Sequence, residues 1–227
     1  MIGRTIICLA WAALGLYAQP PITELLSKAR YAMAAGQMET AENLLNSAVA
    51  ADPRSASARF LLGFCLYLEN DFERARAALA LADQNDARVT LYLALSEEGL
   101  GHTEAAVTFY KRALQRDPRN TETHVAYARL LRKLGQAEQA ESWIDTALKI
   151  APKAREVLYA KGQCLFDRGE YASAAEFGER ALAAEGPTPS EREVRFLLAR
   201  AWLKAGNPER AAKHRAIFES LPMPLVR

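Results

Sequence analysis

The stretch Gly101–Pro118, GHTEAAVTFYKRALQRDP, has the composition of a short helix with a glycine before it and a proline after it. Two other stretches of the same length share this layout: GQAEQAESWIDTALKIAP at 135–152 and GQMETAENLLNSAVAADP at 36–53. In all three, an alanine follows the glycine by five residues, a large side chain by nine and a second alanine by twelve. Glycine suits a left-handed residue that ends one helix, and proline stops the next. The chain therefore repeats one helical unit.

The repeat has a period of 34 residues, measured from Gly101 to Gly135 and again from Pro118 to Pro152. A 34-residue period with a glycine at mid-unit, small residues at fixed places and a closing proline resembles the tetratricopeptide repeat. The resemblance covers almost all of the chain after its N-terminal segment. An ordinary helical bundle is the main alternative, but a bundle has no need to restart its pattern at this interval.

The resemblance implies an all-α fold, a right-handed α-α superhelical solenoid of about six helix pairs. One pair cannot bury its own apolar faces, whereas a stack of pairs can. A short lead is expected at 19–21 and a tail at 222–227. The units are expected at 22–55, 56–86, 87–120, 121–154, 155–188 and 192–221. Unit five departs from the pattern by placing Gly178 where a large side chain is expected, and unit six is degenerate.

The first 18 residues have the features of a secretory signal peptide. Arg4 precedes TIICLAWAALGLYA, an apolar stretch of 14 residues from Thr5 to Ala18. Spanning a bilayer takes about 20 apolar residues, so cleavage after Ala18 is favoured over a permanent anchor. We therefore expect an exported protein, periplasmic or extracellular, with no stable membrane insertion after cleavage.

Composition and motifs give no sign of an enzyme. The formal net charge is only +2, which offers no electrostatic reason to expect a nucleic-acid partner. The three histidines, His102, His124 and His214, stand in no metal-binding or catalytic motif. Glu97 and Glu98 are expected to be solvent-exposed acids and not a general acid/base pair. We expect no catalytic residue, no metal and no cofactor.

Two cysteines, Cys65 and Cys164, hold the same position in units two and five. Helices pack about 8–10 Å apart, so three units of stack separate the two by roughly 25–30 Å. A disulfide needs Cα atoms within about 7 Å. No disulfide is expected between them, and both are interpreted as small buried residues.

The resemblance also implies that the first helix of each pair lines a concave groove. It places on that wall the candidate binding residues Phe60, Phe64, Tyr67, Leu91, Leu95, Arg129, Arg132, Lys133, Tyr159, Phe166, Phe196 and Arg200. Further wall positions are occupied by Leu26, Arg30, Met33, Leu68, Glu98, Glu122, Val125, Gln163, Asp167, Leu203 and Lys204. The alternative is that the rings pack between neighbouring units and the cations are solvated.

A groove of this kind predicts a non-enzymatic scaffold that binds a protein or peptide segment. Its rings and its basic cluster (Arg129, Arg132 and Lys133) would complement a segment with apolar anchors and an acidic residue. Some family members clamp a C-terminal carboxylate with Lys and Asn, but the corresponding places here hold Leu26, Arg30 and Leu61. Two alternatives stay open: a structural or assembly subunit of an envelope or secretion complex, and a helical accessory subunit of a separate enzyme.

Overall fold

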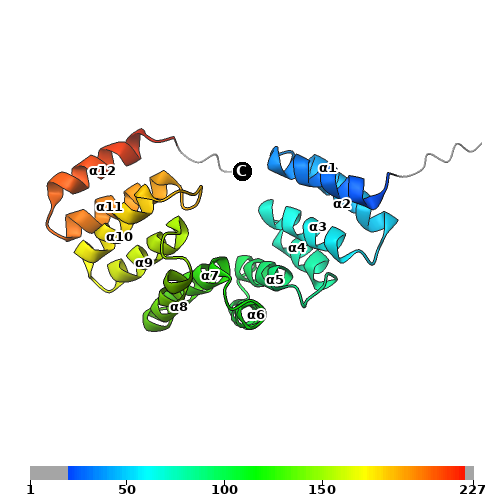
Figure 1. Ribbon diagram of the computed structural model, residues 1–227, viewed down its shortest axis with the longest axis horizontal. Coiled ribbons are helices and arrows are strands. Elements are labelled where there is room, and N and C mark those ends of the chain that lie inside the picture. Colours follow the sequence, from blue (N-terminus) through cyan, green and yellow to red (C-terminus); the bar gives the residue numbers. More distant parts are fainter. Residues whose placement is uncertain (1–19, 223–227) are drawn as a thin grey trace, which may run out of the picture. The chain divides into compact units, whose positions relative to one another are not determined.

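The computed structural model describes residues 20–222, which contain twelve α-helices and no strand (Figure 1). The helices are α1 (Ile22–Ala34), α2 (Met38–Ala51), α3 (Ala56–Leu68), α4 (Phe72–Ala80), α5 (Ala87–Gly99), α6 (Thr103–Arg116), α7 (Thr121–Lys133), α8 (Ala137–Ile150), α9 (Arg155–Asp167), α10 (Tyr171–Ala183), α11 (Glu191–Lys204) and α12 (Pro208–Ser220). The predicted signal peptide and most of the predicted tail lie outside the described residues. The expected all-α repeat fold is confirmed.

The chain divides into two compact units, Met1–Arg54 and Ser55–Arg227. In its described part, the first unit consists of the helix pair α1 and α2. Their shared core is made of small and medium-sized side chains: Leu25, Ala29, Ala32, Ala41, Leu45 and Ala48. Alanine at the contact lets the two helices approach closely, as the repeat pattern predicts.

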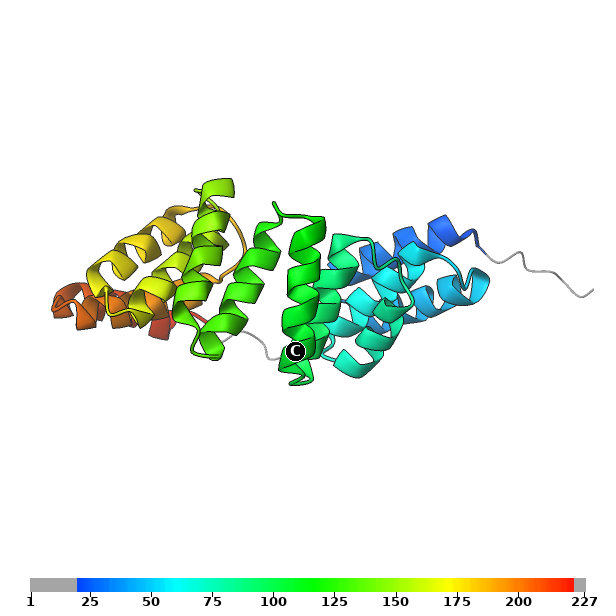
Figure 2. The ribbon, with the colours of Figure 1, turned by 90° about the horizontal axis from the view of Figure 1, so that it is seen from below.

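The second unit contains the five pairs from α3 to α12 (Figures 1 and 2). From α4 onward each helix packs against the one before it, and the first helices α3, α5, α7, α9 and α11 also pack against one another in that order. Within the described residues, the second helices of successive pairs make no such contact. One side of this unit is therefore formed by first helices alone.

The turn inside each pair depends on one left-handed residue. At the end of α5, Gly101 has φ +78°; its N–H donates to the carbonyl of Glu98, and that of His102 donates to the carbonyl of Glu97. This pairing is the Schellman arrangement that satisfies the last carbonyls of a helix. In the pair α3–α4 the equivalent residue is Asn70, with φ +62°. Asparagine is one of the few residues that tolerate this conformation.

Close packing explains two glycines inside helices. A Cβ on Gly63 would lie 2.5 Å from Cγ of Leu79, and a Cβ on Gly178 would lie 2.8 Å from Cδ2 of Leu198. Both leucines are fully buried. Gly178, which departs from the repeat pattern in sequence, therefore makes room for the leucine of the next helix pair.

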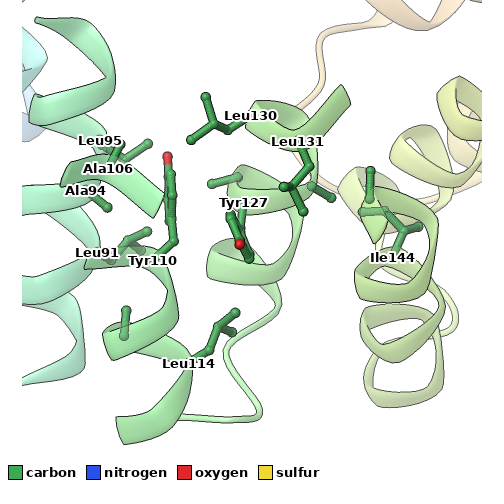
Figure 3. Packing of buried hydrophobic residues seen from close by; sticks show 14 of the residues in the cluster. Leu91, Ala94, Leu95, Ala106, Tyr110, Leu114, Tyr127, Leu130, Leu131 and Ile144 are labelled. Carbon is green, nitrogen blue, oxygen red and sulfur yellow. The ribbon is translucent and has the colours of Figure 1, made fainter. Parts of the chain in front are cut away.

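The core of the second unit is continuous across its pairs. Tyr110 of α6 is fully buried and lies between the leucines of α5 and the α7 side chains Tyr127 and Leu130 (Figure 3). The rings of Tyr110 and Tyr127 stack at 5.5 Å between centroids. This stack links two successive pairs. It covers apolar surface that a single pair would leave exposed.

The two cysteines of the described residues are free and buried, Cys65 on α3 and Cys164 on α9. Burial raises the pKa of the Cys164 thiol to about 11, so it stays protonated at neutral pH. Within the described part of the chain, no helix combines the length and apolar character that crossing a bilayer requires.

Candidate interaction groove

A cavity of about 400 Å³ opens on the side of the second unit that the first helices form. We call it the inner groove. Side chains from α3, α5, α7, α8, α9 and α11 line it, together with the loop before α11. The lining residues are Tyr67, Leu95, Glu122, Val125, Ala126, Ala128, Arg129, Arg132, Ile144, Glu156, Tyr159, Ala160, Gln163, Thr188, Pro189 and Glu193.

Five of the twelve candidate residues named from the sequence line this groove. They are Tyr67, Leu95, Arg129, Arg132 and Tyr159. Repeat register brings them together because each lies on a first helix and points to the same side. The structure thus assembles a groove where the repeat pattern expects one, although its lining is only partly the expected one.

Three other candidates lie in the packed interior or in contacts between pairs. Leu91 is fully buried and belongs to the core. The rings of Phe60 and Phe64 stack on each other at 6.2 Å, and Phe64 also contacts Tyr92 of α5 at 4.7 Å. Sequence reasoning missed Tyr92, which packs against α3 and so joins two successive pairs.

A second, separate cleft of about 440 Å³ lies on α11 and α12. Phe196 and Arg200 line it, with Leu203 and Phe218. The guanidinium of Arg200 lies 4.5 Å from the ring centre of Phe166 and 5.3 Å from that of Phe196. Phe196 and Arg200 therefore belong to this cleft, which we call the terminal cleft. Phe166 on α9 contacts Arg200 but lines neither this cleft nor the inner groove.

Two of the basic candidates, Arg129 and Lys133, form ion pairs with Glu98, whose side chain is largely covered. Glu98 accepts hydrogen bonds of 2.7 Å from Lys133 Nζ and from the hydroxyl of Tyr110, and Arg129 Nη2 lies 3.5 Å from it. Burial alone would raise the pKa of this carboxyl, but the hydrogen bonds from Lys133 and Tyr110 and the nearby positive charges hold it below its ordinary value. Glu98 is therefore negatively charged at neutral pH, and the positive charges of Arg129 and Lys133 balance it.

The expectation that Glu97 and Glu98 are exposed is wrong. Glu97 is 6% exposed and accepts a hydrogen bond of 2.7 Å from His102 Nδ1, and the side chain of Glu98 is 11% exposed. The helical pattern shows only that the two acids lie on different faces. It does not show that α3, α4, α6 and α7 all pack against α5.

Arg132 is also engaged within the protein. Its Nε donates to Asp167 Oδ2 at 2.7 Å, and its Nη1 donates to Gln163 Oε1 at 2.7 Å. With Arg129 and Lys133 paired to Glu98, each cation of the basic cluster has a carboxylate partner. Because each cation already has a partner within the protein, the basic cluster does not favour an acidic residue in a bound segment. This differs from the expectation drawn from the sequence.

Carboxylates gather at the opposite end of the inner groove. Glu122 accepts a hydrogen bond of 3.3 Å from the Tyr92 hydroxyl, and Glu156 accepts one of 3.4 Å from the Thr121 hydroxyl. Across residues 20–222, neither carboxylate makes an ion pair. A third acid, Glu193, caps the N-terminus of α11.

Repeat register could have identified this acidic end. Glu122, Glu156 and Glu193 are the second residues of units four, five and six counted from the expected starts at 121, 155 and 192. One acid per pair therefore recurs on the same wall of the groove. Of the three, only Glu122 is among the wall residues expected from the sequence.

A stack of helix pairs with a groove on the first-helix side defines a repeat scaffold. Two family models, both described as tetratricopeptide repeat, match the chain, one at residues 32–97 and 99–164 and the other at residues 179–214. The matches cover more than half of the chain. The chain belongs to the tetratricopeptide repeat family.

Known proteins share this fold at low sequence identity. The Pseudomonas aeruginosa pilF structure has a TM-score of 0.73 and 17% identity, covering 88% of this chain and 90% of that one. The structure of PilW, described as a widely conserved type IV pilus biogenesis factor, has a TM-score of 0.75 and 14% identity, covering 88% and 92%. At these identities the likeness shows the fold alone.

A curated relative matches over a shorter stretch. The human protein O-mannosyl-transferase TMTC1 is 37% identical over 93 residues, which are 40% of this chain. The match spans 10% of the length of that relative. The transferase activity in its name is therefore a property of that longer protein.

Proposed function

We propose that this chain is a non-enzymatic scaffold that binds an extended or helical segment of another protein in the inner groove. The observation that carries the proposal is the groove itself, a preformed cavity of about 400 Å³ lined by first helices from five successive pairs. Members of the family are scaffolds for protein–protein interaction, which agrees with this function.

The lining of the groove suits a protein segment. Tyr67 and Tyr159 are half-buried, so each ring presents an apolar face while its hydroxyl stays near polar groups. Leu95 and Val125 supply aliphatic surface between them. Aromatic anchors with a polar rim are characteristic of sites where a few residues carry most of the binding free energy.

An affinity capture with matched variants tests this function. The double variant Tyr67→Ala, Tyr159→Ala removes both rings from the groove, and each truncated anchor is expected to cost about 2 kcal/mol of binding. This variant should no longer capture the proteins that mass spectrometry identifies with the unmodified protein. The control, Tyr31→Ala, removes a tyrosine that is 76% exposed on α1 and should capture them as the unmodified protein does.

A second function, an assembly subunit held through its terminal cleft, is favoured by one observation. Phe196 is 47% exposed and Leu203 is 62% exposed at that cleft. The same capture experiment separates the two functions. If Leu203→Ser loses the captured proteins while the two groove tyrosines can be truncated without effect, the assembly role replaces groove binding. Circular dichroism must show that all variants keep their helices.

A further inference from the structure

Charge is unevenly compensated along the inner groove. At one end Arg129 and Arg132 pair with carboxylates of the protein. At the other end, the only side-chain hydrogen-bond partners of Glu122 and Glu156 among residues 20–222 are hydroxyls, at 3.3 and 3.4 Å. Each carboxylate has several lone-pair sites, so one long hydrogen bond leaves most of its acceptor capacity unused.

These two acids lie on adjacent first helices. Glu122 is the second residue of α7 and Glu156 the second residue of α9, and α7 packs directly against α9. Both line the groove, where Glu122 is exposed and Glu156 half-buried, and the two also lie together in a neighbouring hollow with Arg119, Asn120, Thr121 and Thr188. Within residues 20–222, Arg119 makes no ion pair with either acid. The geometry therefore places two like charges at one point along a binding surface.

The environment of Glu122 shows the effect of this arrangement. Partial burial of its carboxyl group, and then the negative charge of Glu156, raise the pKa of Glu122 above its ordinary value. The hydrogen bond from Tyr92 offsets only part of this. A positive charge between the two carboxylates would relieve both the repulsion and the unfavourable desolvation.

We infer that the segment bound in the inner groove carries a lysine or arginine whose cationic group lies between Glu122 and Glu156. This inference rests on the proposed function. Its apolar neighbours in the segment would contact Tyr67, Val125 and Tyr159 farther along the groove. The recognised class is therefore a protein segment with one basic residue close to aromatic or aliphatic residues, and not an acidic one.

The two acids could also act only by stabilising their own helices, and the experiment has to distinguish that role from binding a cation. An acid in the first turn of a helix favours the helix through its dipole, wherever it lies. The chain offers a matched control, because Glu104 and Glu138 are the second residues of α6 and α8 and are exposed outside the groove. Replacing either pair of acids by glutamine removes the same dipole effect, but only one pair faces the groove.

The experiment selects binders from a random library of displayed peptides about twelve residues long, using the unmodified full chain as bait. We expect enriched peptides to share a lysine or arginine beside apolar residues. An enriched peptide, synthesised with a fluorophore, should bind Glu104→Gln, Glu138→Gln as tightly as the unmodified protein. Its Kd for the Glu122→Gln, Glu156→Gln variant should rise about tenfold, because the cation of the peptide loses both carboxylate partners.

A double-mutant cycle then assigns the contact. Replacing the basic residue of the peptide by glutamine should weaken binding to the unmodified protein about tenfold, and should have little further effect on the Glu122→Gln, Glu156→Gln variant. Additive losses would overturn the inference, because they would show that the cation and the two acids do not interact.

Failure of the inference and failure of the proposed function give different results. Peptides enriched without a basic residue, and lost from Tyr67→Ala, Tyr159→Ala, would overturn the inference and leave groove binding intact. If no peptide is enriched, or if enriched peptides bind the tyrosine variant unchanged, groove binding fails and the inference fails with it.

Discussion

Glu98 holds together helices from two successive pairs. It lies on α5 and accepts hydrogen bonds from Tyr110 on α6 and Lys133 on α7. Its pKa lies below the ordinary carboxyl value. A group with a lowered pKa contributes stability that is present above the unfolded pKa, about 4.3, and is lost as the pH falls through the folded one.

We expect Glu98→Gln to lower the free energy of unfolding by about 1–2 kcal/mol at pH 7, because hydrogen bonds to charged groups contribute roughly that much. At pH 3 the difference from the unmodified protein should be smaller, because this pH lies below the unfolded pKa of about 4.3 and protonation of the unfolded chain removes part of the contribution of Glu98. Urea unfolding at both pH values measures this. Glu104→Gln is the control, and a difference of the same size at both pH values for Glu98→Gln would contradict the assignment.

The turn residue Asn70 shows which turns the repeat pattern predicts and which it misses. The repeated glycine in the sequence correctly indicates the turns after α1, α5 and α7, and a left-handed glycine also ends α9 and α11. The same turn after α3 uses Asn70, which a search for glycine does not find. The conformation is common to all pairs, whereas the residue that adopts it is not.

At the scale of a single element, α8 offers a direct test of the repeat register. Ala140 is completely buried on this helix, and Gln136 is its exposed N-cap residue, without a side-chain hydrogen bond to the helix. The two positions are four residues apart but lie in opposite environments.

Ala140→Asp should destabilise the protein by about 3–5 kcal/mol, because it buries an unpaired carboxylate in a helix contact. Gln136→Asp should leave stability unchanged or raise it by up to about 1 kcal/mol, since aspartate at the N-cap accepts a hydrogen bond from the first turn. Thermal unfolding followed by circular dichroism compares the two. Equal losses would mean that the register of α8 is wrong.

Helix positions follow from the sequence more completely than the groove does. Small residues, glycine turns and prolines recur at fixed intervals, so each helix begins and ends close to its expected place. The lining of the groove depends on which side chains meet in space. The ring of Phe60 packs against Tyr92 and does not line the groove, and Arg132 pairs with Asp167, 35 positions along the chain. No periodicity within one helix encodes either pairing.

At the scale of the whole molecule, stability in a repeat fold is approximately a sum over pairs and their interfaces. Phe218 is half-buried on α12, 5.5 Å from the ring of Phe196, and the guanidinium of Arg192 lies 4.1 Å from its centre. Arg192 also donates hydrogen bonds to the carbonyls of Phe218 and Leu221. These contacts close the side of the last helix pair that the structure describes.

Phe218→Ser should therefore weaken α11 and α12 by about 1–2 kcal/mol, in proportion to the apolar area that it exposes. Hydrogen exchange should become faster in these two helices and change little in α5 to α8. Ile217→Ser, at a residue that is 37% exposed, is the control and should have a smaller effect. Faster exchange throughout the second unit would instead indicate that all its pairs unfold together.

The described residues contain two tryptophans, placed in different parts of the second unit. Trp143 on α8 is half-buried, with its ring 5.5 Å from that of His124 and 5.6 Å from that of Tyr127. Trp202 on α11 is 9% exposed, donates a hydrogen bond to Glu179 and lies under the guanidinium of Arg210. Indole fluorescence shifts to longer wavelength when water reaches the ring. The protein thus carries two built-in optical markers, one reporting on its middle pairs and one on its last described pair.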